Sequence, residues 1–133
     1  MTALYYTTWP FGNIERAYIM SAEYREDNGD GSFVNPRPMP SPINTGQQDI
    51  SLSPAPDGKG FFFSSRRPGG YGGWDLYFAP LEDGRIGPPV NLGPGINSPG
   101  NDVHLSIIGD SLYFCSNREG GMGLYDIYSS TIV

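Results

Sequence analysis

The sequence has few basic residues. Lys59 is the only lysine, and with seven arginines against 14 acidic residues the net charge is −6. A protein that binds a nucleic-acid backbone or an anionic membrane needs clustered basic residues, which the sequence does not contain. We therefore expect no nucleic acid and no membrane among its partners.

Cysteine and histidine are equally scarce. Cys115 is the only cysteine, which excludes an internal disulfide, and as a strand residue it is expected to be small and buried. His104 is the only histidine, so neither a histidine-rich metal site nor a histidine-based triad has a second member nearby. The sequence predicts no cofactor and no metal site.

Long apolar runs are also missing. No segment approaches the roughly 20 apolar residues of a membrane-spanning helix, and the first residues lack the basic and apolar parts of a signal peptide. No segment has the pattern of a helix of ten or more residues. Glycine (19 residues) and proline (13 residues) are instead abundant between aromatic runs, which is typical of a many-stranded single domain and argues against disorder.

One segment of the sequence occurs in three copies. Residues 61–78, an aromatic strand, a glycine-rich loop and a second strand, recur 51 positions later as residues 112–129. A degraded copy occupies residues 4–20, with Arg16 where the other copies have aspartate. The linkers recur 53 positions apart, since Ile43-Asn44-Thr45 and Asp49 match Ile96-Asn97-Ser98 and Asp102. A repeat of this length indicates a propeller or a solenoid.

The repeated residues resemble those of the TolB-type, WD-like β-propeller repeat. The residues that carry the likeness are Ser53-Pro54, Asp57-Gly58, Phe63-Ser64-Ser65, Arg67, Gly69-Gly70 and Asp75-Leu76-Tyr77, with Phe114, Ser116-Asn117-Arg118, Gly120-Gly121 and Asp126-Ile127-Tyr128 in the next copy. The resemblance implies an all-β fold of antiparallel blades and a binding or scaffolding role in the bacterial periplasm or envelope.

On this basis we expect a single partial-propeller domain, residues 1–133. Its blades would span residues 1–46, 47–99 and 100–133 and contain ten strands, namely three, four and three. Propellers usually close with four to eight blades, and an open ring exposes apolar faces and strand edges. We therefore predict a homodimer in which a second subunit completes a six-bladed ring.

Two arginine–aspartate pairs lie at the ends of the glycine-rich loops. Arg67 with Asp75, and Arg118 with Asp126, are each eight residues apart, so each arginine is expected to clamp its hairpin by binding the aspartate or the neighbouring serine hydroxyls. A catalytic pair would need two acids facing one cavity, and here each acid has a cation nearby. A structural clamp is the favoured interpretation, and catalytic residues are not assigned.

The axial ends of the innermost strands supply a candidate ligand site. Asp49 and Ser51 in one blade, and Asp102 and His104 in the next, would meet at the central mouth, where small ligands bind propellers. For His104 an ordinary solvated strand position is the alternative. The same two acids would serve a propeller-type glycoside hydrolase, which is the alternative function.

The glycine-rich loops supply a second candidate. Gly69-Gly70-Tyr71-Gly72-Gly73 and Gly120-Gly121-Met122-Gly123 have no following helix or lysine to bind phosphate, and each would project one apolar residue, Tyr71 or Met122. Phe11 is at the corresponding place in the first copy. Such residues suit a sugar or a protein partner, and packing on the neighbouring blade is the alternative.

The acidic stretch Asp27-Asn28-Gly29-Asp30-Gly31 resembles a calcium loop but lacks the closing acid, so a polar hairpin turn is favoured. Together these features predict a non-catalytic recognition or scaffold module that binds a protein, a peptide or a glycan.

Overall fold

The protein is an all-β domain in the computed structural model, which describes residues 3–132. Apart from two short 3-10 turns (Pro10–Gly12 and Ile14–Arg16), every regular element in this range is a strand, in three antiparallel sheets. No helix in the range is long and apolar enough to cross a membrane. The all-β class and the antiparallel sheets are therefore confirmed.

The first sheet has the order β1 (Ala3–Thr8), β2 (Tyr18–Asp27), β3 (Asp30–Pro38). The β2–β3 hairpin turns at Asn28 and Gly29, both with positive φ, as a two-residue hairpin turn requires. The turn is shorter than the acidic stretch of residues 27–31, because Asp27 and Asp30 pair with each other and continue the two strands. Pro36 and Pro38 are tolerated in β3 because it is an edge strand.

The second sheet contains β4 (Asp49–Pro54), β5 (Gly60–Ser65) and β6 (Asp75–Glu82), with β7 (Arg85–Ile86) and β8 (Val90–Asn91) both paired to β6. The expected single outer strand is thus two short pieces, which gives eleven strands in residues 3–132 rather than ten. Pro88 and Pro89 lie between the pieces, and proline has no N–H to donate to a strand ladder.

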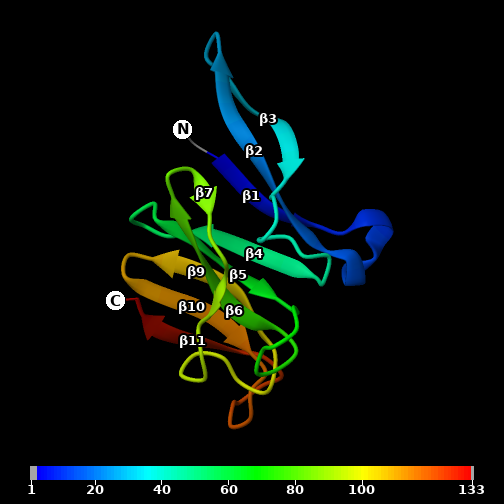
Figure 1. The fold of residues 1–133 in the computed structure, drawn as a ribbon, viewed down its shortest axis with the longest axis vertical. Coiled ribbons are helices and arrows are strands. Elements are labelled where there is room, and N and C mark those ends of the chain that lie inside the picture. The colour runs from blue at the N-terminus through cyan, green and yellow to red at the C-terminus, as the bar shows by residue number, and fades with distance from the viewer. Residues whose placement is uncertain (1–2, 133) are drawn as a thin grey trace.

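The third sheet has the order β9 (Asp102–Ile108), β10 (Ser111–Ser116), β11 (Asp126–Thr131). Its register repeats that of the second sheet, since Ser65↔Asp75 in β5–β6 corresponds to Ser116↔Asp126 in β10–β11. Figure 1 shows the three sheets following one another along the long axis, with the β2–β3 hairpin projecting at one end. The described residues form an open stack with no closed ring.

The core lies between neighbouring sheets and repeats with them. Between the first and second sheets, Ile19, Phe63 and Tyr77 form one buried cluster. Between the second and third sheets, Leu76 and Phe114 are buried, and Tyr128 packs against them. Ile19 and Leu76 are fully buried at equivalent positions, so each interface is built from the same repeated residues.

Candidate functional site

The two buried carboxylates Asp49 and Asp102 are each held by an arginine. Arg67 Nη2 lies 3.1 Å from Asp49 Oδ1, and Arg118 Nη2 lies 2.9 Å from Asp102 Oδ1. Both aspartates are fully buried. A buried charge is stable only when it is paired and hydrogen-bonded, and these two are both.

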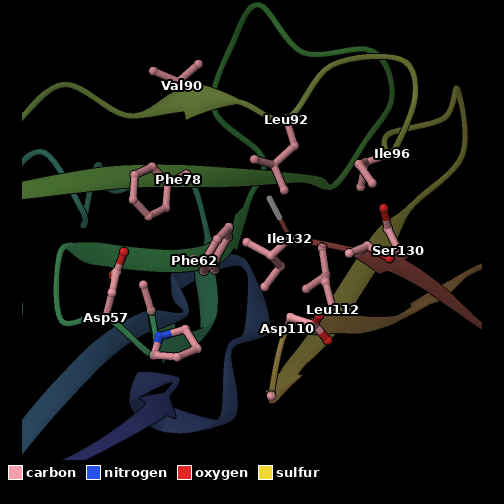
Figure 2. A pocket seen from close by; sticks show the side chains of 14 residues that line it. Asp57, Phe62, Phe78, Val90, Leu92, Ile96, Asp110, Leu112, Ser130 and Ile132 are labelled. Atoms are coloured by element: carbon pink, nitrogen blue, oxygen red, sulfur yellow. The ribbon is translucent and has the colours of Figure 1, made fainter.

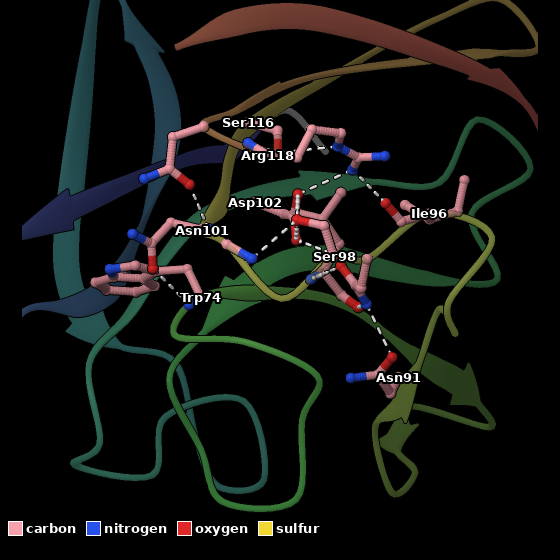
Figure 3. Close-up of polar contacts among 12 residues, drawn as sticks. Trp74, Asn91, Ile96, Ser98, Asn101, Asp102, Ser116 and Arg118 are labelled. Carbon is pink, nitrogen blue, oxygen red and sulfur yellow. Dashed lines mark hydrogen bonds and ion pairs between the residues drawn. The ribbon is translucent and has the colours of Figure 1, made fainter. Parts of the chain in front are cut away.

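The rest of each carboxylate is satisfied by local groups. The backbone N–H of Thr45 donates to Asp49 over 2.8 Å, and that of Ser98 donates to Asp102 over the same distance. The Ser65 hydroxyl donates to Asp49 over 2.6 Å. Figure 3 shows the Asp102 cluster, with Arg118 on one side of the carboxylate and Ser98 on the other. The side chains come from a linker, an inner strand and a loop, so each cluster ties three segments together.

Each arginine also stacks on aromatic rings of its own sheet. The guanidinium of Arg67 lies 4.8 Å from the ring centre of Phe63 and 5.1 Å from that of Tyr77. Arg118 lies 5.2 Å from Phe114 and 4.6 Å from Tyr128. These contacts fix the arginine by a cation–π attraction in addition to the ion pair.

The expected aspartate partners of the two arginines were wrong, whereas the expected serine bonds are present: Arg67 Nε donates to Ser65 Oγ over 2.9 Å, and Arg118 Nε donates to Ser116 Oγ over 3.0 Å. Arg67 binds Asp49 rather than Asp75, and Arg118 binds Asp102 rather than Asp126. Asp75 instead accepts a hydrogen bond from the N–H of Tyr71, over 2.7 Å, because its carboxylate faces the glycine-rich loop. The arginines are structural clamps as expected, but each joins its loop to an inner strand and not across its hairpin.

Asp75 and Asp126 fix the glycine-rich loops. Asp126 Oδ2 accepts from the N–H groups of Met122 and Gly123, over 2.9 and 3.2 Å. Gly70 and Gly121 must be glycine, because a Cβ there would overlap the Asp75 and Asp126 carboxylates. Burial without a paired cation raises the pKa of Asp75, although hydrogen bonds from the loop backbone partly oppose the rise.

The loop residues predicted from the sequence are exposed. Met122 is 100% exposed and Phe11 101%, and Tyr71 is half exposed. Phe11 has a φ of 54°, a left-handed conformation that directs the chain sharply within the first loop. The alternative, that these side chains pack on a neighbouring blade, does not hold for Phe11 and Met122 in the described part of the chain.

Ser51 and His104 form a second candidate site at the inner strands. Ser51 Oγ lies 3.3 Å from His104 Nδ1, which brings equivalent positions of neighbouring units together. Both residues have positive φ values, 57° and 53°, which are uncommon for residues other than glycine. The Thr7 hydroxyl oxygen accepts a hydrogen bond from the Ser51 N–H, so all three sheets contribute to this edge.

Asp49 and Asp102 do not join them there. The strand pairing shifts register between Ile50 and Ser53, and again opposite His104, so simple alternation along the strand fails at these bulges. The expected ligand role of the two aspartates was therefore wrong, because both are buried in ion pairs. The two acids that the glycoside hydrolase alternative named are the same two buried carboxylates.

Sequence reasoning missed the linker asparagines. Asn97 accepts a hydrogen bond from the N–H of Leu76 and donates one to its C=O, over 2.7 and 2.9 Å. Asn44 makes the same two bonds to Ile19. The recurrence of Ile-Asn-Thr/Ser at a spacing of 53 was the available signal.

The remaining candidates are simple to place. The acidic stretch at residues 27–31 is the tip of the β2–β3 hairpin, and residues 3–132 contain no group of three or more His, Cys, Asp or Glu residues that could hold a metal ion. Cys115 is half-buried rather than buried. No protein-family model matches the sequence, and neither the curated proteins nor the solved structures include a match.

Proposed function

We propose that this chain is a non-catalytic recognition module of the β-propeller type, similar to the TolB repeats, and that it binds a protein partner through its strand-connecting loops. The observation that carries the proposal is the exposure of an apolar side chain in the equivalent loop of each sheet, namely Phe11, Tyr71 and Met122. The loops that carry them follow β1, β5 and β10 along the same side of the stack in Figure 1.

The loops are shaped before any partner arrives. The aspartate bonds to Tyr71 and Met122 hold the loop backbone without help from the exposed side chains. A preformed loop loses little conformational entropy on binding, so apolar contacts at its tip translate efficiently into affinity. The arrangement favours recognition over chemistry.

A protein partner fits the side chains better than a glycan. Leu124, 90% exposed, lies beside Met122 in the same loop. Methionine and aromatic residues are enriched at the centres of protein interfaces, whereas sugar stacking uses flat aromatic faces. Binding of a glycan is a result that the test below distinguishes.

The loop proposal can be tested by site-specific photo-crosslinking in the native cell. A photoreactive amino acid at position 71 or 122 should give discrete adducts, and the same group at Ile108, which is 67% exposed on β9, is the matched control. Adducts at position 71 should disappear when Phe11 and Met122 are changed to serine. Equal labelling from all three positions, or specific signals on a glycan array instead, would contradict a protein partner.

We further propose that a second copy covers the two outermost sheet faces and closes the ring as a homodimer. Ile127 is 75% exposed, although its equivalents Leu76 and Ile19 are fully buried between sheets. At the other end, Leu4 and Tyr24 are each 40% exposed. A dimer that pairs these faces would bury both apolar surfaces in one symmetric assembly.

Light scattering during gel filtration tests the dimer. The chain should elute at twice 14.5 kDa, and Ile127→Lys should convert it to the monomer, whereas Leu124→Lys, in an exposed loop, should not. A wild-type monomer at micromolar concentration would rule the assembly out.

A further inference from the structure

An open apolar groove lies between the second and third sheets, beside the outer edge of β11. Its volume is about 670 Å³. Figure 2 shows Phe62, Leu112 and Ile132 converging on this space, with Leu92 and Ile96 along one side. The groove is separate from the loops that carry Phe11, Tyr71 and Met122.

The internal repeat shows what fills the equivalent place one unit earlier. Between the first and second sheets, Tyr5, Phe61 and Leu81 take the positions of Phe62, Leu112 and Ile132, and there Ile86 of β7 packs against them. In residues 3–132 no side chain takes the place of Ile86 in the second groove. The groove therefore lies where, in the preceding unit, the apolar side chain of an outer strand packs.

The backbone edge of β11 beside the groove corresponds to the edge of β6 that pairs with an outer strand. In the second sheet the N–H of Gly87 donates to the C=O of Pro80 over 2.7 Å, and β7 pairs Ile86 with Leu81. The equivalent of Pro80 is Thr131, and that of Leu81 is Ile132. The Ile132 N–H makes the repeat's usual bond to Asp110, over 2.7 Å, as Leu81 does to Lys59 over 2.8 Å, so this end of β11 is in the same geometry as β6. No strand in the described residues pairs with its outer edge.

The rim of the groove has a charge preference. Asp57 and Asp110 line it, and no basic residue does. A basic residue of the occupant that reaches this rim therefore complements its charge.

We propose that the β11 edge and this groove form an acceptor for an extended segment of another protein, which adds as an antiparallel strand. The segment places a branched apolar side chain in the groove, an N–H on the Thr131 carbonyl and a basic residue near Asp57 and Asp110. Main-chain bonds supply part of the affinity in such strand addition, and the side-chain pocket supplies specificity. The free edge strand of a second copy, β3, is a poor donor because Pro36 and Pro38 have no N–H to donate to the Thr131 carbonyl.

The test uses a fluorescein-labelled peptide with the sequence of residues 83–93, which contains the chain's own Arg-Ile-Gly outer strand, and measures fluorescence anisotropy with the intact protein. Saturable binding is expected. Replacing Ile86 by Asp in the peptide should weaken binding at least tenfold. Replacing Gly87 by N-methylglycine, which removes only the N–H, should weaken it roughly two- to tenfold, the value of one hydrogen bond.

Protein variants locate the site. Ile132→Asp should abolish binding, whereas Phe33→Asp, at an exposed position on the β2–β3 hairpin, should leave it unchanged. The double variant Asp57→Asn and Asp110→Asn should weaken binding several-fold and remove its salt dependence. If Ile132→Asp does not fold, the two altered peptides carry the test.

Three results would overturn the assignment. One is the absence of binding at millimolar peptide, and another is equal affinity for the glycine and N-methylglycine peptides. The third is dissociation of a protein dimer by the peptide, which would place a second copy in the groove.

Discussion

Arg67 is the only cation that pairs with the buried Asp49 carboxylate in the described residues. Its side chain is 12% exposed and that of Asp49 is fully buried, with 3.1 Å between them. Changing Arg67 to Met keeps much of the aliphatic volume but leaves the Asp49 carboxylate buried without a cation. Removing one member of a buried pair usually costs about 3–5 kcal/mol, which is a large part of the roughly 5–15 kcal/mol that stabilises a domain.

The chain contains a matched control for this experiment. Arg37 and Glu23 form an ion pair at the same 3.1 Å distance, but the arginine is 62% exposed. Exposed pairs contribute about 0–1 kcal/mol, so Arg37→Met should change the free energy of unfolding very little. Both variants are compared by urea unfolding at pH 7 and low salt.

A third variant separates the charge from the packing. Asp49→Asn combined with Arg67→Met removes both charges while the amide oxygen still accepts from Thr45, so the double variant should be more stable than Arg67→Met alone. Two results would show that the buried carboxylate is not the source of the loss. One is an Arg67→Met loss in the free energy of unfolding no larger than that of Arg37→Met. The other is a loss in the double variant that equals the sum of the losses in the two single variants.

Two further predictions concern groups that the repeat buries. The folded-state pKa of Asp75 is raised, so its contribution to stability is complete below the unfolded pKa of about 4 and is lost as pH rises through the folded value. Asp75→Asn should therefore lose less stability than the wild type between pH 4 and pH 7, as measured by urea unfolding. Identical pH profiles for the two proteins would contradict this reasoning. Asn97→Ala leaves the N–H and C=O of buried Leu76 without their partners and should cost about 2–4 kcal/mol, measured by the same method, whereas Asn101→Ala, which removes one bond to the Trp74 N–H, should cost about half as much or less.

The sequence predicted the antiparallel pairing in the second and third sheets well, because the repeat there is local and keeps a single spacing. The spacing of 51 places Ser65 and Ser116, and Asp75 and Asp126, at the same register positions, and the structure pairs them identically. The division of the outer strand was less visible, since it depends on two prolines whose effect is only to interrupt hydrogen bonding to β6. Closure into a ring stays a prediction.

The ion-pair partners could not be read from spacing along the chain. Ser65 lies opposite Asp49 in β4 on one side and opposite Asp75 in β6 on the other, so Arg67 has two carboxylates within reach of its hairpin. Asp75 is nearer in sequence, but its Oδ2 is engaged by the Tyr71 N–H. The hydrogen bond from the loop backbone decides which aspartate pairs with Arg67, and the spacing of residues in the sequence does not predict that bond. The bulges at Ser51 and His104 escaped for a similar reason, because alternation assumes regular strands.

The three copies within one chain act as replicates of one structure. Residues that form the buried network recur, since the aspartate–arginine pair is present in the second and third units and the linker asparagine makes the same bond to Ile19 in the first unit and to Leu76 in the second. The loop tips do not recur, since phenylalanine, tyrosine and methionine occupy equivalent exposed places. A position that the fold requires must repeat with the fold, whereas one that contacts a partner needs to match only that partner. The variation at Phe11, Tyr71 and Met122, on a backbone that is held alike in the second and third units, is therefore what recognition of an asymmetric protein surface would require.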